Sequence, residues 1–148
     1  MAVQLTGAIK QYYNEYGKYP DFRGDGQFVD AAGNARILRV LRAQDDNRNP
    51  RKIVFFEGTP ARKSKTFGGH WEGGLDPQSG ALLDPWGNPY RIMLDADYDG
   101  TISHPYSQDD QPTLRLGVIV WSPGKDGQQG APGDPLKLRG SDDIVSWK

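Results

Sequence analysis

The chain has 148 residues, which is enough for one domain with one core. It has no Cys, which excludes a disulfide framework, a thiolate metal site and a cysteine nucleophile. The net charge of -1 hides a segregation, because residues 36–65 carry nine Lys or Arg and three acids, whereas residues 72–110 carry one Arg and eight acids. Surfaces of opposite sign suit a self-assembling subunit, and ordinary solvated faces are the alternative. A basic region without interleaved aromatics disfavours nucleic-acid binding.

The composition also points to a modest core. Hydrophobic residues make up 36% of the chain, the mean hydropathy is -0.72, and the 19 Gly and 11 Pro predict much ordered loop. The printed sequence contains no run of about 18 apolar residues, so we expect this chain to be soluble as given. A loop-rich chain without disulfides needs another local restraint, and a bound calcium ion is a natural one.

The first predicted element is a helix over residues 3–16. Its apolar side chains recur at the spacing of one helical face: Leu5, Ala8, Ile9, Tyr12 and Tyr16. Gly17 is expected to end the helix, and Pro20 supports that stop. The helix is therefore expected to pack one face on the core.

A second helix is predicted after a Gly- and Asp-rich loop. Asn34 is expected to cap it and Ala43 to end it, with Arg36, Arg39 and Arg42 on an exposed ridge. Residues 51–57 are expected to be extended, and residues 58–80 are expected to form a long loop.

The second half of the chain has the pattern of an antiparallel sheet. Strands are predicted at residues 81–83, 90–94 and 114–121, where β-branched and aromatic residues dominate. Because the helices come first and the strands second, the sequence predicts an α+β fold with the first helix laid across a small antiparallel sheet.

Two acidic segments are candidate calcium sites. In the C-terminal loop, Asp126 lies on one arm, and Asp142 and Asp143 lie on the other, so these carboxylates meet if the loop folds back before Trp147. Calcium takes six to eight oxygen ligands, and the Pro123 carbonyl is a candidate backbone donor. The alternative is that the aspartates only cap turns.

The second candidate is the run from Asp95 to Ile102, which matches the first eight positions of an EF-hand loop. Asp95, Asp97, Asp99 and Thr101 are its candidate ligands. Position 12 should be a bidentate Glu but is Tyr106, and Asp109 or Asp110 would have to replace it. A polar hairpin tip is the equally weighted alternative.

Enzyme chemistry finds little support in the residues. His70 and His104 lack the spacing of a zinc site, and no Gly-x-Ser-x-Gly elbow is present. The paired carboxylates lack an apolar pocket that would raise the pKa of one partner, as glycoside hydrolysis requires. We therefore expect no catalytic activity.

Four segments stand out by their order and spacing. They are residues 8–20, Asp84-Pro85-Trp86-Gly87-Asn88-Pro89-Tyr90, Ser122-Pro123-Gly124-Lys125-Asp126-Gly127 and Ser141-Asp142-Asp143-Ile144-Val145-Ser146-Trp147. Each segment alone indicates only a helix or a tight turn. Together, in this order and spacing, they resemble the major (G-type) pseudopilins of bacterial type II secretion systems. The resemblance implies calcium ligands at Asp126 and Asp143. The chain departs from the family pattern at Ser141, with Asp142 displaced by one position, and in a longer loop that contains Pro132 and Pro135.

The resemblance implies a single pilin-like periplasmic domain over residues 1–148. Residues 1–17 would be the remainder of a stem helix, residues 21–80 a variable region, and residues 81–148 the sheet and the calcium loop. In the full protein an apolar helix of about twenty residues would precede this chain and anchor it at the periplasmic face of the inner membrane.

The function implied is polymerisation into a fibre that drives protein export. The partners would be copies of the same chain, other pseudopilins and an inner-membrane assembly platform. A type IV or competence pilus subunit is the nearest alternative, although those heads usually carry a disulfide. A stand-alone calcium-dependent adhesin or binding module is the alternative of another class.

Overall fold

The fold is described from a computed structural model, which places residues 1–20, 31–63, 71–95, 98–106, 113–135, 138 and 141–147. The chain is α+β, as the sequence predicts, with two helices followed by short antiparallel strands. The elements in chain order are α1 (Ala2–Tyr16), α2 (Ala31–Leu41), β1 (Arg62–Lys63), β2 (Trp71–Glu72), β3 (Gly74–Leu75), β4 (Leu82–Leu83), β5 (Arg91–Leu94), β6 (Ile102–Ser103), β7 (Thr113–Leu114), β8 (Val118–Ser122) and β9 (Ile144–Val145).

Helix α1 forms where the apolar periodicity predicts it. Leu5, Ile9 and Tyr12 on its inner face are fully buried, whereas Val3 on the outer face is 65% exposed. Gly17 follows the helix with φ 70°, and its N–H donates to the Tyr13 carbonyl at 2.7 Å. A left-handed residue at this position closes the last turn, and Gly adopts it without steric cost.

The predicted cap of the second helix is wrong. Helix α2 spans Ala31–Leu41, so Asn34 lies inside the helix, and its side chain is fully buried. Asn34 Nδ2 donates to the carbonyls of Leu82 (3.2 Å) and Tyr90 (2.8 Å), and its Oδ1 accepts the Leu82 N–H at 2.9 Å. The side chain therefore joins α2 to β4 and the residue before β5, a use that local sequence preference does not indicate.

The strands form several small sheets. The order β5-β8-β9 makes an antiparallel three-stranded sheet, with Ile92 opposite Val120 and Trp121 opposite Val145. The predicted strand at 81–83 instead pairs with β3, and the predicted strand at 114–121 is divided between β7 and β8.

The region expected to be loop or extended also differs from the prediction. Residues 58–80 contain β1, β2 and β3, which are each two residues long and therefore too short to leave a periodic pattern. Residues 51–57 form no strand, although Phe56 is buried. The expectation that residues 58–80 are entirely loop is therefore wrong.

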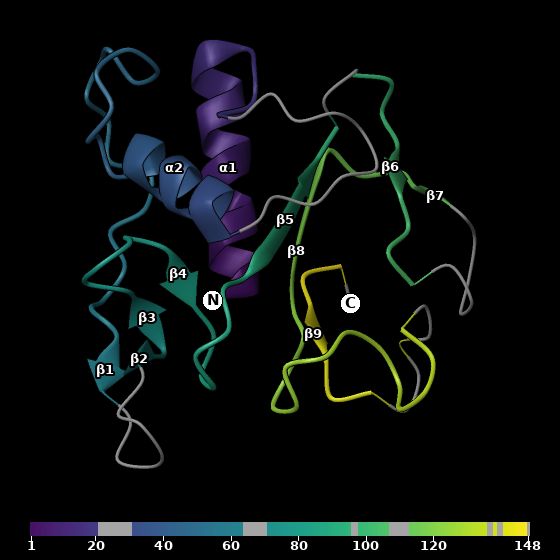
Figure 1. The fold of residues 1–148 in the computed structure, drawn as a ribbon. Coiled ribbons are helices and arrows are strands. Elements are labelled where there is room, and N and C mark those ends of the chain that lie inside the picture. The colour runs from purple at the N-terminus through teal and green to yellow at the C-terminus, as the bar shows by residue number, and fades with distance from the viewer. Residues whose placement is uncertain are drawn as a thin grey trace.

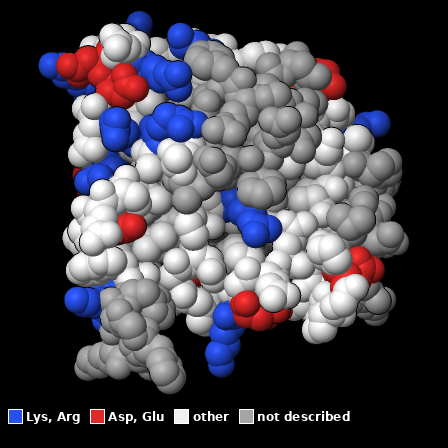
Figure 2. All heavy atoms as spheres, in the orientation of Figure 1, with Lys and Arg blue, Asp and Glu red and all other residues white. Residues whose placement is uncertain are grey.

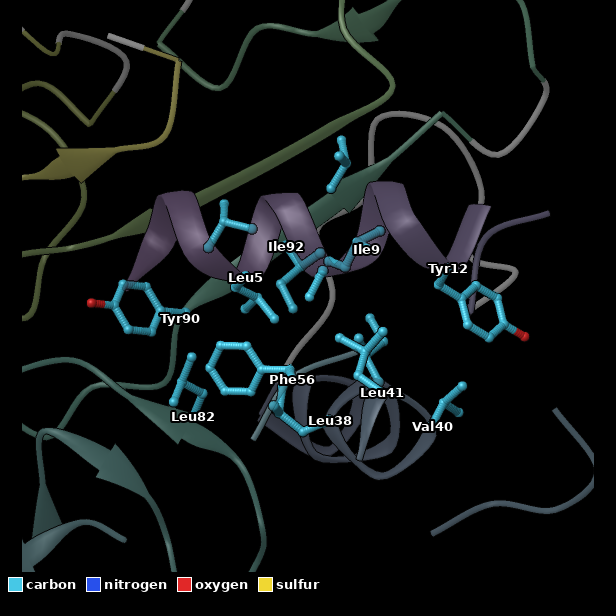
Figure 3. Packing of buried hydrophobic residues seen from close by; sticks show 14 of the residues in the cluster. Leu5, Ile9, Tyr12, Leu38, Val40, Leu41, Phe56, Leu82, Tyr90 and Ile92 are labelled. Carbon is cyan, nitrogen blue, oxygen red and sulfur yellow. The ribbon is translucent and has the colours of Figure 1, made fainter. Parts of the chain in front are cut away.

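One large core lies where the helices cover β5 and β8. This helix-side cluster contains Leu5, Ile9 and Tyr12 of α1, Leu38 and Leu41 of α2, and Phe56, Leu82, Tyr90, Ile92 and Val120, among others. Figure 3 shows α1 and α2 directing these side chains toward one another over β5. Full burial of a Leu or Ile side chain contributes about 1.5–3 kcal/mol, so α1 is a major source of stability.

A second core lies on the opposite face of the same strands. This loop-side cluster contains Met93, Ile102, Tyr106, Ile119, Trp121 and Leu138, with Trp147 packed against them. Successive residues of a strand point to opposite faces, so Ile92 joins one cluster and Met93 the other. Because both faces of β5 and β8 are buried, their sequences show no clean alternation of apolar and polar residues.

The arrangement in Figure 1 places α1 and α2 on one side of the β5–β8 pair and β9 with the C-terminal loop on the other. Within the placed residues, no helix combines the length and the apolar character needed to cross a membrane.

Candidate metal centre

The corner at residues 84–90 is organised by one buried carboxylate. Asp84 is fully buried, and its Oδ1 accepts the backbone N–H groups of Trp86 (3.0 Å) and Asn88 (2.8 Å). The Ser122 hydroxyl donates to Oδ2 of the same carboxylate. These bonds satisfy a charge that would otherwise be costly to bury, and they connect the corner to the end of β8.

The same corner holds the turn that carries Asp126. Ser122 Oγ accepts the Gly124 N–H at 3.0 Å, and Asn88 Nδ2 donates to the Gly124 carbonyl at 3.0 Å. Asp84 accepts the hydroxyl of Ser122, which in turn accepts the Gly124 N–H, and Asn88 binds the Gly124 carbonyl. The 84–90 corner therefore holds both backbone polar groups of Gly124. The sequence shows both turns but not this connection between them.

The two arms of the C-terminal loop meet at Gly124. Gly124 has φ 76°, and a Cβ there would lie 2.5 Å from both the backbone oxygen and Oδ1 of Asp142. Only glycine permits this approach. The Asp126 N–H donates to Asp142 Oδ2 at 3.0 Å, which brings an aspartate of one arm against the backbone of the other.

Asp143 is the most enclosed of the three aspartates. Its Oδ2 accepts the Tyr106 hydroxyl and the Gly130 N–H (2.8 Å), whereas Oδ1 is buried and has no hydrogen-bond partner among the residues that the structure describes. Burial raises the pKa of Asp143 above its ordinary value, and the hydrogen bond from Tyr106 opposes that rise. Burial and the neighbouring Asp143 raise the pKa of the Tyr106 hydroxyl, which therefore remains a donor.

The structure brings Asp126, Asp142 and Asp143 together, with one carboxylate oxygen of each within 4.8 Å of the others. Asp126 and Asp142 are exposed, and Asp143 is half-buried. Three carboxylates this close repel one another, and a divalent cation would remove the repulsion. The partnerless Asp143 Oδ1 is a further unmet acceptor in this group. The residues present therefore fit a hard, oxygen-preferring cation such as calcium.

The predicted backbone donor lies in the same turn. Pro123 is buried. Its two neighbours in the chain, Ser122 and Gly124, are hydrogen-bonded to Asp84 and Asn88 of the corner. Calcium ligation by its carbonyl stays a prediction.

The second candidate loop has a different internal arrangement. Asp95 is buried, and its two oxygens accept the N–H groups of Asp99 (3.2 Å) and Gly100 (2.8 Å). Asp99 Oδ1 accepts the N–H (2.9 Å) and hydroxyl (3.0 Å) of Thr101. These bonds are typical of an aspartate-stabilised turn. Asp97, Asp109 and Asp110 lie outside the described residues, so metal binding by this loop stays a prediction.

The two histidines are placed differently. His104 is buried, and its Nδ1 accepts the Tyr106 N–H at 2.9 Å. His70 lies outside the described residues.

Sequence reasoning missed the residues that support the carboxylate cluster. Ser122 and Asn88 stand in segments that the motifs single out, but their contacts join positions 36 to 38 residues apart. Tyr106 stands at the twelfth position of the EF-hand-like run, where it is an unsuitable ligand, yet its hydroxyl donates to Asp143. Local patterns cannot reveal such long-range pairs.

Comparison of the chain with models of known protein families finds no match, and comparison with curated proteins finds none. The likeness to pseudopilins therefore rests on the four motif segments.

Proposed function

We propose that this protein is a structural subunit of a type II secretion pseudopilus. In this role it polymerises with copies of itself and related pseudopilins into a periplasmic fibre, on an assembly platform in the inner membrane. Its part in export is mechanical and not catalytic. The proposal names the class of the assembly and leaves the exported cargo open.

The meeting of Asp126, Asp142 and Asp143 carries the proposal. These residues come from two arms of a loop, and their carboxylate oxygens lie within 4.8 Å of one another. Two of the three, Asp126 and Asp143, are the positions at which the resemblance implies calcium ligands. A bound calcium ion would supply charge neutralisation and hold the arms of the loop together.

The arrangement of α1 gives further support. One face of this helix is buried on β5 and β8, while Val3 on another face remains 65% exposed. In the proposed fibre, α1 continues the apolar stem that the resemblance implies, and the rest of the chain forms a head around it. Calcium would keep the C-terminal loop of each head in the shape that its neighbours contact.

The proposal is tested in the bacterium that encodes the protein. Deleting the gene should abolish export of the secreted proteins, and overproducing the full-length product should yield fibres visible by electron microscopy. Normal export by the deletion strain, together with no fibres on overproduction, would refute the assignment.

The calcium part has its own comparison. The double variant Asp126→Asn/Asp142→Asn changes two exposed carboxylates of the cluster. Its matched control, Asp46→Asn/Glu57→Gln, removes the same charge from exposed positions elsewhere. We expect the first variant to lose fibres and export while the control retains both. Equal behaviour of the two variants would remove calcium from the proposal.

A further inference from the structure

Each carboxylate of the cluster has one oxygen engaged by the protein and one open oxygen, which has no hydrogen-bond partner among the described residues. Asp126 Oδ1 accepts the Gln128 N–H at 2.9 Å, and Asp142 Oδ2 accepts the Asp126 N–H at 3.0 Å. Both of these aspartates are exposed. Figure 2 shows acidic side chains at the surface in the lower centre of the view, where Figure 1 draws the turn after β8. Water can therefore solvate the open oxygens of Asp126 and Asp142.

Asp143 differs, because water does not reach its open oxygen. Oδ1 is buried and has no hydrogen-bond partner in the described part of the chain, whereas Oδ2 accepts two bonds, from Tyr106 and Gly130. A carboxylate oxygen that loses its water without gaining a partner is costly. The two donors on Oδ2 thus leave Oδ1 as the oxygen that Asp143 can give to a cation.

The Tyr106 hydroxyl is presented to Asp143 from a fixed position. The side chain is fully buried in the loop-side cluster, and its ring centroid lies 6.1 Å from that of Trp147 and 6.4 Å from that of His104. The Tyr106 N–H also donates to His104 Nδ1 at 2.9 Å. Close packing on these sides leaves the ring little freedom to move.

The side-chain amide of Gln129 uses its whole hydrogen-bonding capacity. Its Oε1 accepts N–H groups from the side chains of Arg91 (2.8 Å) and Trp121 (3.2 Å). Its Nε2 donates to the carbonyls of Pro105 and Pro135, both at 3.1 Å. Arginine and tryptophan side chains only donate and carbonyls only accept, so a single orientation of the amide satisfies all four contacts. Gln129 thereby ties the C-terminal loop to β5, to β8 and to the loop after β6.

This tie fixes the two donors of Asp143 Oδ2 relative to each other. Pro105 directly precedes Tyr106 in the chain, and Gln129 directly precedes Gly130. The bond between Gln129 and the Pro105 carbonyl therefore lies one position away from each donor. Separating the two donors would require breaking it.

We propose that Tyr106 and Gln129 are positioning residues of the cation site, which hold Asp143 by Oδ2 so that Oδ1 is the oxygen supplied to calcium. The inference rests on the calcium part of the proposed function, and neither residue touches the ion itself. Groups that orient metal ligands typically change metal affinity by about ten- to a hundredfold. Loss of either residue is therefore expected to lower calcium affinity more than loss of a similar hydrogen bond elsewhere.

Removal of the Tyr106 hydroxyl tests the inference. Tyr106→Phe keeps the buried ring and deletes the bond to Asp143. Isothermal titration calorimetry should show calcium binding about ten- to a hundredfold weaker than in the parent chain. Tyr12→Phe is the matched control, because Tyr12 is also fully buried and its hydroxyl donates to the Arg48 carbonyl at 2.6 Å on the helix side. This control should bind calcium as tightly as the parent.

A second pair of variants tests the tie, and it decides the question if Tyr106→Phe does not fold. Gln129→Ala removes all four contacts of the amide and should also weaken calcium binding about ten- to a hundredfold. Gln128→Ala is its control at the neighbouring position. Gln128 is exposed, and its bond to Asp126 comes from the backbone N–H, which the substitution keeps. Gln128→Ala should therefore retain the parent affinity.

Terbium(III), which prefers oxygen ligands as calcium does, gives a readout that a loss of stability alone would not change. Its luminescence lifetimes in H2O and D2O report how many water molecules remain on the bound ion. Tyr106→Phe should leave more water on the ion than the parent does, because a loosened Asp143 yields a ligand position to solvent. Tyr12→Phe should match the parent. Equal hydration of the ion in Tyr106→Phe and the parent would contradict the inference.

The titrations separate failure of this inference from failure of the proposed function. If the parent chain binds no calcium, calcium leaves the proposed function and the inference fails with it. If the parent binds calcium and both Tyr106→Phe and Gln129→Ala bind it equally well, only the positioning role is wrong. An equal loss of affinity in Tyr106→Phe and Tyr12→Phe would also overturn that role, because general loosening of the fold would explain both. Deletion of the gene tests the fibre function independently of these titrations.

Discussion

The two faces of the β5–β8 pair are stabilised in different ways. The helix-side cluster is built from regular elements, with Leu5, Ile9 and Tyr12 of α1 fully buried against α2 and the strands. The loop-side cluster is built from aromatic rings and irregular backbone, and Trp147 lies near the rings of His104, Tyr106 and Trp121. One side therefore depends on helix packing and the other on the correct closure of loops.

The difference extends to polar groups. On the loop side, Asp143 Oδ1 and Trp147 Nε1 are buried without hydrogen-bond partners in the described part of the chain. An unpaired buried polar atom costs about 1–3 kcal/mol. Of these two atoms only the Asp143 oxygen could be satisfied by a cation, because the indole N–H of Trp147 is a donor. The buried Asn34 side chain, on the helix side, uses both of its polar atoms. The comparison indicates that an added cation should stabilise the loop side and leave the helix side unaffected.

The largest expected loss of stability comes from a substitution in the helix-side cluster. Ile9→Ala should lower the free energy of unfolding by about 2–5 kcal/mol, because it removes a fully buried side chain and leaves a cavity. Urea denaturation should show the same loss with calcium and with chelator. The exposed Val3→Ala is the control and should change little. A calcium-dependent loss for Ile9→Ala would contradict the independence of the two sides.

The next largest expected effect is the stabilisation of the loop side by calcium. Calcium at a hundred times its dissociation constant should raise the free energy of unfolding by about 2.7 kcal/mol, because only the folded loop gathers the ligands. Asp126→Asn/Asp142→Asn should abolish this gain, as measured by urea denaturation with calcium and with chelator. Identical unfolding curves of the parent chain under both conditions would leave the aspartates with turn capping alone.

A smaller effect is expected at the connection between the corner and the loop. Asn88→Ala removes the side-chain hydrogen bond to the Gly124 carbonyl and should cost about 0.5–1.5 kcal/mol. It should also weaken calcium binding about tenfold or more in isothermal titration calorimetry, because residues that orient ligands affect affinity without touching the metal. Asn47→Ala, at an exposed position, is the control. Unchanged calcium affinity would reduce Asn88 to a purely local turn residue.

Some features follow from the sequence by itself. The helix over α1 and its end at Gly17 were predictable because a helical period of apolar residues and a left-handed glycine are local signals. The α+β class and strands β5 and β8 follow from the same kind of pattern. The approach of Asp126 to Asp142 and Asp143 was anticipated from their positions on two arms of one loop.

Only the tertiary structure decided how the pieces are connected. The use of Asn34 as a tie between α2 and β4, the pairing of β4 with β3, and the bonds from Asn88 to Gly124 and from Tyr106 to Asp143 all join residues far apart in the chain. A polar side chain such as Asn has the same local sequence preferences whether it caps a turn or bonds across the core. Its hydrogen-bond partner is set by tertiary packing and not by the neighbouring sequence. For the same physical reason, the sequence shows that Asp126, Asp142 and Asp143 lie on two arms of one loop, but only the fold shows that Asp143 Oδ1 is buried without a partner among the described residues.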